Sequence, residues 1–268
     1  MRQVMTIAGS DSGAGAGIQA DLKTFAALGV YGLSAITSLT AQNTRGVTHV
    51  HEAPVESVRA QIRALFDDFD VAAVKTGMLP TEAIIDCVAE ELERAGPRPL
   101  VVDPVMVSTT RAELMRGDAL PALRDRLVPL ATVVTPNRFE ASALIGRDLR
   151  GAEDLRAAAA EIARLARGWA VLKGGDLEEE EESTDFLSDG TETVALSAPR
   201  IRTRGTHGTG CTFASALAAR LALGDDVPAA ARRAKAYVTG AIRGGPDIGG
   251  GRGPVDHFWF QRPWSPED

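Results

Sequence analysis

Cysteine is scarce in this sequence, and clusters of basic residues are absent. The 268 residues include two cysteines, Cys87 and Cys211, which cannot form a disulfide framework. We therefore expect a reducing compartment. The formal net charge is −7, and no run of Lys and Arg offsets it. Because basic side chains supply most of the contacts to phosphate backbones, the sequence argues against a nucleic-acid partner and favours a small-molecule ligand.

Long hydrophobic runs are also missing. No segment approaches the roughly 18 apolar residues that a membrane helix needs. The apolar stretch in MRQVMTIAGSDSG, at the N-terminus, is too short for the core of a signal peptide, and small polar residues follow it instead of a cleavage site. With 44% hydrophobic residues, the chain can still bury a full core. We expect a soluble cytoplasmic protein that does not bind membranes.

Two common nucleotide-binding motifs are absent as well. The chain has no GxxxxGK[ST] segment, which excludes a P-loop. The glycine-rich segment GAGAG at 13–17 lacks the final glycine of a dinucleotide fingerprint, and no acidic residue ends the next apolar run at 34–43. A loop that places Asp11 and Asp21 near a substrate is the better interpretation of this segment.

Hydrophobic periodicity predicts an alternation of strands and helices. Short apolar runs, typical of buried strands, occur at 4–9, 34–40, 71–77, 99–105, 132–137 and 170–175. Amphipathic stretches of helical length occur at 17–28, 55–66, 81–95, 118–128, 153–167, 209–223 and 227–243. The segment STDFLSDGTETVAL predicts a hairpin that turns at Asp189–Gly190. This order predicts one α/β domain over 1–268, with a mostly parallel sheet covered on both faces.

Polar or glycine-rich clusters follow the apolar runs with unusual regularity. They read GSDSGAGAG, AQNT, KTGM, DPVM, TPNRFE and KGGD in chain order. The carboxyl ends of parallel strands lie at one edge of a sheet, which is where open α/β sheets bind ligands. The sequence therefore predicts that these clusters converge on one binding site.

The segment GTHGTGC opens a helix with Gly205, Gly208 and Gly210. Amides at a helix start have no intrahelical partner and carry the positive end of the helix dipole, so they bind anions. This segment is suited to phosphate oxygens or to a transferring phosphoryl group. Cys211, in the first turn, is expected to have a lowered pKa and to act as a base or hydrogen-bonding partner for a substrate hydroxyl. The alternative is a small buried residue without a chemical role.

Eight motifs together resemble a known kinase family. AGSDSGAGAGIQADLKTFAALGVYG, TAQNTRGV, KTGML, VVDPVMV, TPNRFEA, VLKGGDL, THGTGCTFASALAA and AKAYVTGAI occur in the order found in the hydroxymethylpyrimidine/phosphomethylpyrimidine kinases of thiamine biosynthesis, members of the ribokinase-like superfamily. The resemblance extends from about residue 4 to Phe258. It implies a three-layer α/β/α fold, ATP and Mg²⁺, a homodimer, and phosphorylation of 4-amino-5-hydroxymethyl-2-methylpyrimidine and then of its monophosphate.

The resemblance also implies roles for individual residues. On the substrate side, Asp21 and Gln42 would hydrogen-bond the aminopyrimidine, and an apolar floor would come from Met78, Val105 and Val107. At the reacting centre, the anion hole would consist of Gly208, Thr209 and Gly210, with Cys211 in the place of the superfamily's usual aspartate base. The magnesium ligands and their waters would involve Asp103, Glu140 and Asn137, and the nucleotide would contact Asn137, Lys173, Thr206 and Lys235.

Each of these residues also has an ordinary structural interpretation. Met78 and the two valines could be core residues, Asp103 a strand-end hydrogen-bonding group, and Glu140 an acid in the first turn of a helix. The chain departs from the family pattern at 13–15, at 108–111, at Asp176 and at Gly205. Two other functions stay open: a pyridoxal kinase of the same fold, and a non-catalytic protein that senses a pyrimidine metabolite.

Overall fold

The computed structural model describes residues 1–107, 114–175, 177 and 181–261. In this part of the chain, nine strands form one sheet in the order β3-β2-β1-β4-β5-β6-β7-β8-β9. The strands are β1 (Gln3–Asp11), β2 (Tyr31–Asn43), β3 (Gly46–Glu52), β4 (Val71–Thr76), β5 (Leu100–Val102), β6 (Val133–Val134), β7 (Trp169–Leu172), β8 (Glu182–Ser188) and β9 (Thr193–Pro199).

The centre of the sheet is parallel and its margins are antiparallel. Strands β2, β1, β4, β5, β6 and β7 pair in parallel. Strand β3 is antiparallel to β2, β8 to β7, and β9 to β8. The mostly parallel sheet is confirmed, and so is the hairpin, because β8 and β9 flank the predicted turn at Asp189–Gly190.

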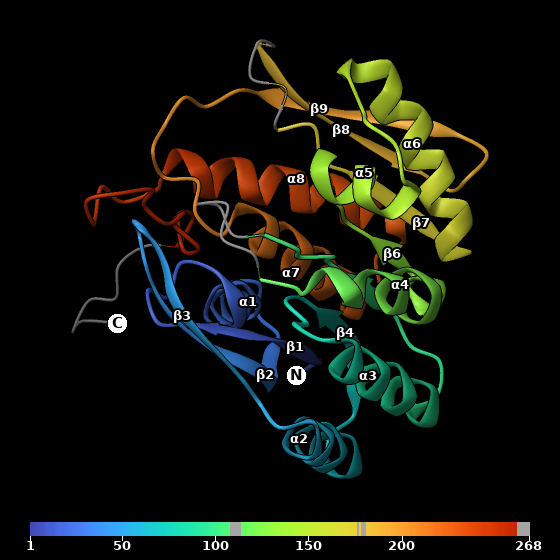
Figure 1. Ribbon diagram of the computed structural model, residues 1–268. Coiled ribbons are helices and arrows are strands. Elements are labelled where there is room, and N and C mark those ends of the chain that lie inside the picture. The colour runs from blue at the N-terminus through green and yellow to red at the C-terminus, as the bar shows by residue number, and fades with distance from the viewer. Residues whose placement is uncertain (108–113, 176, 178–180, 262–268) are drawn as a thin grey trace.

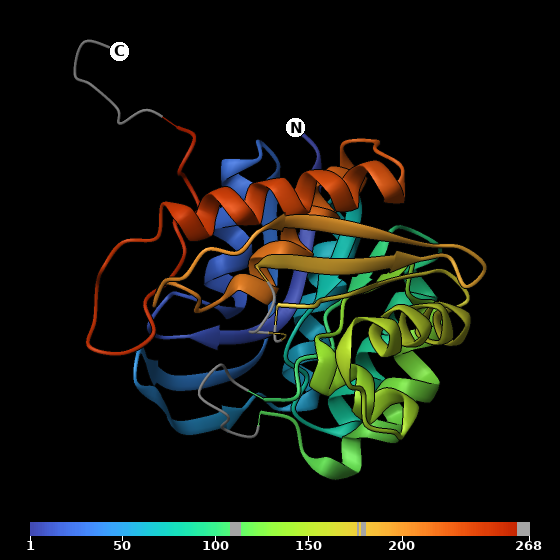
Figure 2. The same ribbon diagram turned by 90° about the horizontal axis from the view of Figure 1, so that it is seen from above.

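Helices cover both faces of the sheet, as Figures 1 and 2 show. The main helices are α1 (Gly17–Ala27), α2 (Val55–Asp68), α3 (Glu82–Ala95), α5 (Arg138–Ile145), α6 (Gly151–Ala166), α7 (Thr209–Ala222) and α8 (Val227–Arg243). One apolar core joins α1, α7 and α8 to one face of the sheet, and another joins α2, α3, α5 and α6 to the opposite face. The predicted three-layer α/β/α architecture is confirmed.

Local details differ from the prediction. Strand β3 was not predicted, and α5 was anticipated only through Glu140 as a first-turn acid. The helix expected over 118–128 is present but irregular: the chain passes without a break from a 3₁₀ helix at Gly117–Ala119 through α4 (Leu120–Ala122) and a π-helix at Leu123–Leu127 to a 3₁₀ helix at Val128–Leu130. Pro121 and Pro129 lie in this segment, and because proline has no backbone N–H, each interrupts the regular helical hydrogen bonds.

A buried polar hub joins four elements at the centre of the molecule. The carboxylate of Asp21, in α1, accepts hydrogen bonds from Thr6 Oγ1 in β1 (2.6 Å) and Ser215 Oγ in α7 (2.6 Å). Lys75 Nζ, in β4, lies 2.8 Å from Asp21 Oδ2 and 3.0 Å from Oδ1. All four residues are fully buried. Because buried charges are stable only when paired, this hub fixes α1 and α7 against the central strands.

We predict that Asp21→Ala lowers the free energy of unfolding by about 3–5 kcal/mol, because it leaves the Lys75 ammonium buried without its counterion. Urea unfolding of the full chain measures this loss. Asp125→Ala is the matched control, since Asp125 is exposed and its ion pair is with the adjacent exposed Arg124, and its urea midpoint should match that of the wild type. Equal midpoints for Asp21→Ala and Asp125→Ala would contradict the role of the hub.

Candidate active site

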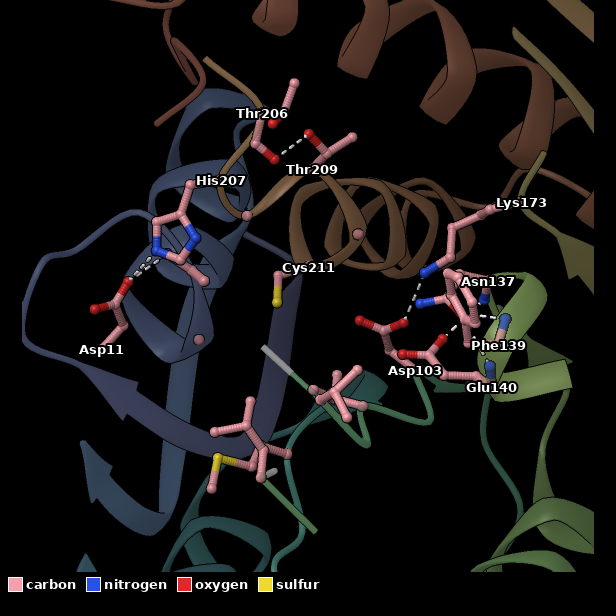
Figure 3. A pocket seen from close by; sticks show the side chains of 18 of the residues that line it. Asp11, Asp103, Asn137, Phe139, Glu140, Lys173, Thr206, His207, Thr209 and Cys211 are labelled. Carbon is pink, nitrogen blue, oxygen red and sulfur yellow. Dashed lines mark hydrogen bonds and ion pairs between the residues drawn. The ribbon is translucent and has the colours of Figure 1, made fainter. Parts of the chain in front are cut away.

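A cavity of about 880 Å³ opens at the carboxyl edge of the parallel strands. Thirteen of the fifteen site residues predicted from the sequence line it: Gln42, Met78, Asp103, Val105, Val107, Asn137, Glu140, Lys173, Thr206, Gly208, Thr209, Gly210 and Cys211. Asp21 and Lys235 do not. In Figure 3, Cys211 lies between two polar groups, with Asp11 and His207 on one side and Asp103, Asn137, Glu140 and Lys173 on the other. The predicted convergence of the strand ends is confirmed.

The start of α7 forms one wall of the cavity. Gly208 precedes the helix with φ = 80°, and a Cβ at this position would collide with the carbonyl oxygen of Gly15. Only glycine adopts this conformation without strain. Within the described residues, the Thr209 amide has a 3.4 Å contact to Thr206 O, whereas the amides of Gly208, Gly210 and Cys211 have no backbone acceptor. The amides available to an anion are therefore those of Gly208, Gly210 and Cys211.

Cys211 has a different protonation state from the one expected. Burial raises the pKa of its thiol to about 11, and the nearby Asp21 and Asp103 carboxylates add to this increase, although Lys75 opposes it. The prediction of a lowered pKa is wrong because removal of the thiol from water outweighs the charge of Lys75 and the backbone N–H of Gly17, which lower it. Cys211 is thus a neutral thiol at physiological pH. Cys87, the other cysteine, is buried in α3 and does not line the cavity.

Asp21 does not line the cavity either. Its two oxygens bind Thr6, Lys75 and Ser215, and its side chain is fully buried. Asp21 therefore cannot hydrogen-bond the substrate as predicted, and its role is indirect. Asp21 holds Lys75, which does line the cavity. Burial favours the neutral amine, but the carboxylates of Asp21 and Asp103 outweigh it and raise the pKa of Lys75.

A group of charged residues occupies the opposite wall. Lys173 Nζ lies 3.1 Å from Asp103 Oδ1, which also accepts a hydrogen bond from Thr135 Oγ1. Burial tends to lower the pKa of Lys173, but the Asp103 and Glu140 carboxylates outweigh burial and raise it. Lys173 therefore stays charged beside two carboxylates, a combination suited to phosphate and to a cation that accompanies phosphate.

Helix α5 places Asn137 and Glu140 in this wall through a capping box. Asn137 Oδ1 accepts the backbone N–H of Phe139 and of Glu140, while Glu140 Oε2 accepts the backbone N–H of Asn137. The interpretation of Glu140 as a first-turn acid is thus also correct. In the described part of the chain, no three His, Cys, Asp or Glu side chains form a group able to hold a metal ion. Asp103 and Glu140 could hold one only together with ligands from outside the protein.

A second cavity of about 590 Å³ adjoins the first and shares Lys173, Gly175, Thr206, Thr209 and Arg252 with it. Its lining combines cationic side chains with the apolar side chains of Phe213, Val238 and Ile242. Lys235 lies in this cavity, where its Nζ is 2.9 Å from Asp185 Oδ2. The pair of cavities suits a ligand with an apolar ring and a string of phosphates.

Lys75, His207 and Arg252 are among the cavity residues that sequence reasoning missed. His207 lies inside the GTHGTGC motif, so the motif itself was the available signal. Arg252 lines both cavities, but a single arginine in a glycine-rich segment gives no pattern to detect. Lys75 follows four apolar residues in β4, and a lysine there was the one local sign of a buried charge.

The structure describes some of the positions at which the chain departs from the family pattern. Residues 108–111 and Asp176 lie outside the described residues. Gly205 lines neither cavity. Its N–H donates to Thr203 Oγ1, and a Cβ at this position would come within 3.3 Å of Pro254 O. Gly205 is therefore part of the packing between two loops.

The family model described as phosphomethylpyrimidine kinase matches residues 11–256. The chain belongs to the phosphomethylpyrimidine kinase family. It is 53% identical over 256 residues to the hydroxymethylpyrimidine/phosphomethylpyrimidine kinase of Streptomyces coelicolor, covering 96% of this chain and 94% of the relative. It is also 53% identical over 262 residues to the enzyme of that name from Rhizobium meliloti, covering 96% of this chain and 98% of the relative. The resemblance identified from the motifs is confirmed.

Solved structures agree with this assignment. An ADP complex of Bacillus subtilis pyridoxal kinase has a TM-score of 0.90 and 41% identity, covering 96% of this chain and 97% of the other. A phosphomethylpyrimidine kinase from Clostridium difficile has a TM-score of 0.79 and 39% identity, covering 90% and 100%. The ribokinase-like fold is confirmed. Among the described residues of this family member, no helix combines the length and the hydropathy that crossing a lipid bilayer requires.

We predict that Cys211 resists alkylation near neutral pH. With a pKa of about 11, its thiolate fraction at pH 8 is on the order of 100-fold below that of an unperturbed thiol. The rate of iodoacetamide labelling, followed by mass spectrometry in a Cys87→Ala background, should rise with pH through the range near 11. Labelling that reaches half its maximum below pH 8 would contradict the raised pKa.

Proposed function

We propose that this chain transfers the γ-phosphoryl group of ATP to the hydroxymethyl oxygen of 4-amino-5-hydroxymethyl-2-methylpyrimidine, and then transfers a second one to the resulting monophosphate. The observation that carries this proposal is the pair of adjoining cavities, which share the start of α7 and Lys173. Acceptor and nucleotide would meet there, at backbone amides that have no backbone acceptor among the described residues. The names of the relatives in the family support the choice of acceptor.

The acceptor would bind in the first cavity beside β2 and β4. Gln42 offers a carboxamide donor and acceptor to the ring edge, and Met78 is 6% exposed and presents an apolar side chain below it. Val105 and Val107 extend this apolar surface. A pyrimidine ring buried between these groups would direct its hydroxymethyl oxygen toward the start of α7.

The nucleotide would bind in the second cavity. Its adenine would pack against Val238 and Ile242, and its phosphates would reach Lys173, Thr206 and Arg252 at the junction. Lys235 would hold the nucleotide side of the cavity through its ion pair with Asp185, and Asn137 would contact the terminal phosphate. A structural neighbour of this chain, a pyridoxal kinase, is an ADP complex, which supports a nucleotide as one of the two ligands.

The charges at the junction suit a loose phosphoryl-transfer transition state. In each transfer, a bond forms between the acceptor oxygen and the γ-phosphorus, the bond from that phosphorus to the β,γ-bridging oxygen breaks, and ADP leaves. Lys173 and the amides of Gly210 and Cys211 would neutralise the negative charge on the transferring oxygens. Positioning and neutralisation therefore carry more of the rate than proton abstraction does.

The neutral Cys211 thiol limits its role. A protonated thiol cannot take the hydroxyl proton, so Cys211 would only orient the acceptor hydroxyl, and the proton would pass to an oxygen of the transferred phosphoryl group as the new bond forms. In the second transfer the acceptor is a phosphate oxygen that is already ionised near neutral pH, because its second pKa is about 6. The second transfer therefore depends less on Cys211 than the first.

Mg²⁺ suits the residues present. Mg²⁺ usually takes one or two carboxylates together with substrate phosphates and waters, and Asp103 and Glu140 supply two carboxylates beside the proposed phosphate position. When bound there, Mg²⁺ would neutralise charge on the phosphates of the nucleotide. The homodimer and the cytoplasmic location that the sequence suggested stay predictions.

A pyridoxal kinase is the second candidate function. The observation that favours it is the TM-score of 0.90 to the Bacillus subtilis pyridoxal kinase. The third reading, a pyrimidine sensor without catalysis, predicts no ATP consumption. The two kinase functions differ in which ring the first cavity accepts, and a rate comparison separates them.

We predict that the full chain with ATP and Mg²⁺ phosphorylates the pyrimidine alcohol and its monophosphate, each with a higher kcat/KM than pyridoxal. A coupled assay of ADP formation measures all three rates, and chelation of Mg²⁺ should stop the reaction. A higher kcat/KM for pyridoxal would favour the second candidate. ADP formation with none of the three acceptors would reject both kinase functions.

We predict that Gly210→Asp abolishes turnover, whereas Cys211→Ala lowers kcat for the alcohol by about tenfold or more and for the monophosphate by less. A Cβ at Gly210 would lie 3.1 Å from Lys173 Nζ and 3.9 Å from Asp103 Oδ2, so an aspartate there adds negative charge at the phosphate position. Gly117→Asp is the matched control, because a Cβ at Gly117 meets no atom within 4 Å. Wild-type activity in both site variants would refute the anion-site assignment.

A further inference from the structure

The carboxamide of Gln42 lies between a histidine and a threonine. Gln42 Nε2 is 3.3 Å from His207 Nε2, and Gln42 Oε1 is 3.0 Å from Thr40 Oγ1. The Thr40 hydroxyl is also 2.9 Å from the carbonyl oxygen of Ser10, to which it donates. The oxygen and nitrogen of an amide are assigned from the hydrogen bonds around them. Whether His207 and Thr40 donate or accept therefore determines which of them faces the oxygen of Gln42 and which faces its nitrogen.

Asp11 determines where the hydrogen of His207 lies. His207 Nε2 is 2.8 Å from Asp11 Oδ2, and both side chains are buried. The same carboxylate accepts the backbone N–H groups of Gly13, Gly15 and Ala16. Burial tends to raise the pKa of Asp11, but the hydrogen bonds from His207, Ala16 and Gly13 outweigh it and lower that pKa. A carboxylate only accepts hydrogen bonds, so His207 carries a hydrogen on Nε2 and donates it to Asp11.

A donor on His207 Nε2 cannot pair with the donor on Gln42 Nε2. Rotation of the carboxamide by half a turn removes this conflict: Gln42 Oε1 then faces His207, and the NH₂ group faces Thr40 Oγ1. Thr40 can accept that hydrogen bond because its own hydrogen goes to Ser10 O. The single N–H of His207 then lies between two acceptors, Asp11 Oδ2 and Gln42 Oε1, as a three-centre hydrogen bond, and the carboxamide NH₂ donates to Thr40 Oγ1.

The surrounding chain is shaped to hold this imidazole ring. A Cβ at Gly15 would collide with the ring of His207. Only glycine at this position therefore allows the glycine-rich loop to pack against the ring. The backbone N–H of His207 donates to Gly253 O at 3.0 Å, and the residue is 6% exposed. His207 is therefore fixed both through its backbone and through its side chain.

We propose that His207, held by Asp11, is the positioning residue that sets the specificity of the first cavity, because it keeps the Gln42 carboxamide in one orientation. An aminopyrimidine presents an N–H donor beside a ring-nitrogen acceptor, and a carboxamide of fixed orientation pairs with only one order of donor and acceptor. A ring with the opposite order would place its acceptor against the oxygen of the Gln42 carboxamide and its donor against the NH₂ group. This inference rests on the proposed function, since it concerns the ring that the same cavity binds.

The test compares two ligands that differ in this order alone: the 4-amino pyrimidine alcohol and its 4-oxo analogue, in which a carbonyl acceptor and a ring N–H replace the amine and the ring nitrogen. Calorimetric Kd values are measured on the full chain with ADP present. His207→Leu should reduce the preference for the amine by on the order of tenfold, because the freed carboxamide can rotate to suit either ligand. His207→Gln retains an N–H donor and should keep most of the preference.

A double-mutant cycle separates this role from general structural damage. In a Gln42→Ala background, His207→Leu should cause no further change in the preference, because the group that it orients is gone. His51→Leu, at an exposed histidine of β3, is the control and should leave the preference unaltered. The inference is overturned if His207→Leu keeps the full preference, or if its effect is equally large without Gln42. If the wild type binds neither ligand, the proposed function itself fails.

Discussion

The position of the site depends on the buried contact between the Asp21 carboxylate and the Lys75 ammonium. With Thr6 and Ser215, it ties α1 and α7 to β1 and β4. The N-terminus of α7 carries the amides that face the cavity, so a shift of this helix would move the anion site away from the strand ends. Two charges without water around them tolerate little displacement, because each would lose its partner. The buried ion pair between Asp21 and Lys75 therefore fixes the position of the anion site in the cavity.

The cavity divides into halves of different electrostatic character. One half, around Asp103, Glu140 and Lys173, holds full charges of both signs close together and suits phosphates with a metal ion. The other half, around Gln42, Met78 and His207, offers hydrogen bonds and apolar surface and suits a small ring. The neutral thiol of Cys211 lies between them, where a charged group would interact with both halves. The arrangement matches a reaction in which charge moves from one ligand to the other.

The strand ends and the start of α7 could be predicted because periodicity and glycine spacing report local backbone geometry. Direction and burial of single side chains could not. Asp21 has the spacing of a substrate ligand, yet its carboxylate points into the core, and only the packing of α1, α7 and β4 shows this. Glycine spacing correctly predicts the start of α7 beside Cys211, but the thiol pKa follows burial, which no local pattern gives. The helix predicted over 118–128 is irregular because Pro121, and Pro129 just after the segment, have no backbone N–H for the hydrogen bonds of an α-helix.

The order of the strands also explains why the crevice lies where it does. From β1 the chain proceeds to β2 on one side, and it later returns to place β4 on the other side of β1. The crossover after β1 runs through α1 on one face of the sheet, and the crossover after β4 runs through α3 on the opposite face. The chain segments that leave these two adjacent strands therefore diverge, which creates a topological switch point. Asp11 ends β1, and Met78 follows β4, so the crevice lies between these two residues. Its position is therefore set by the order of the strands and not by the sequence of the loops.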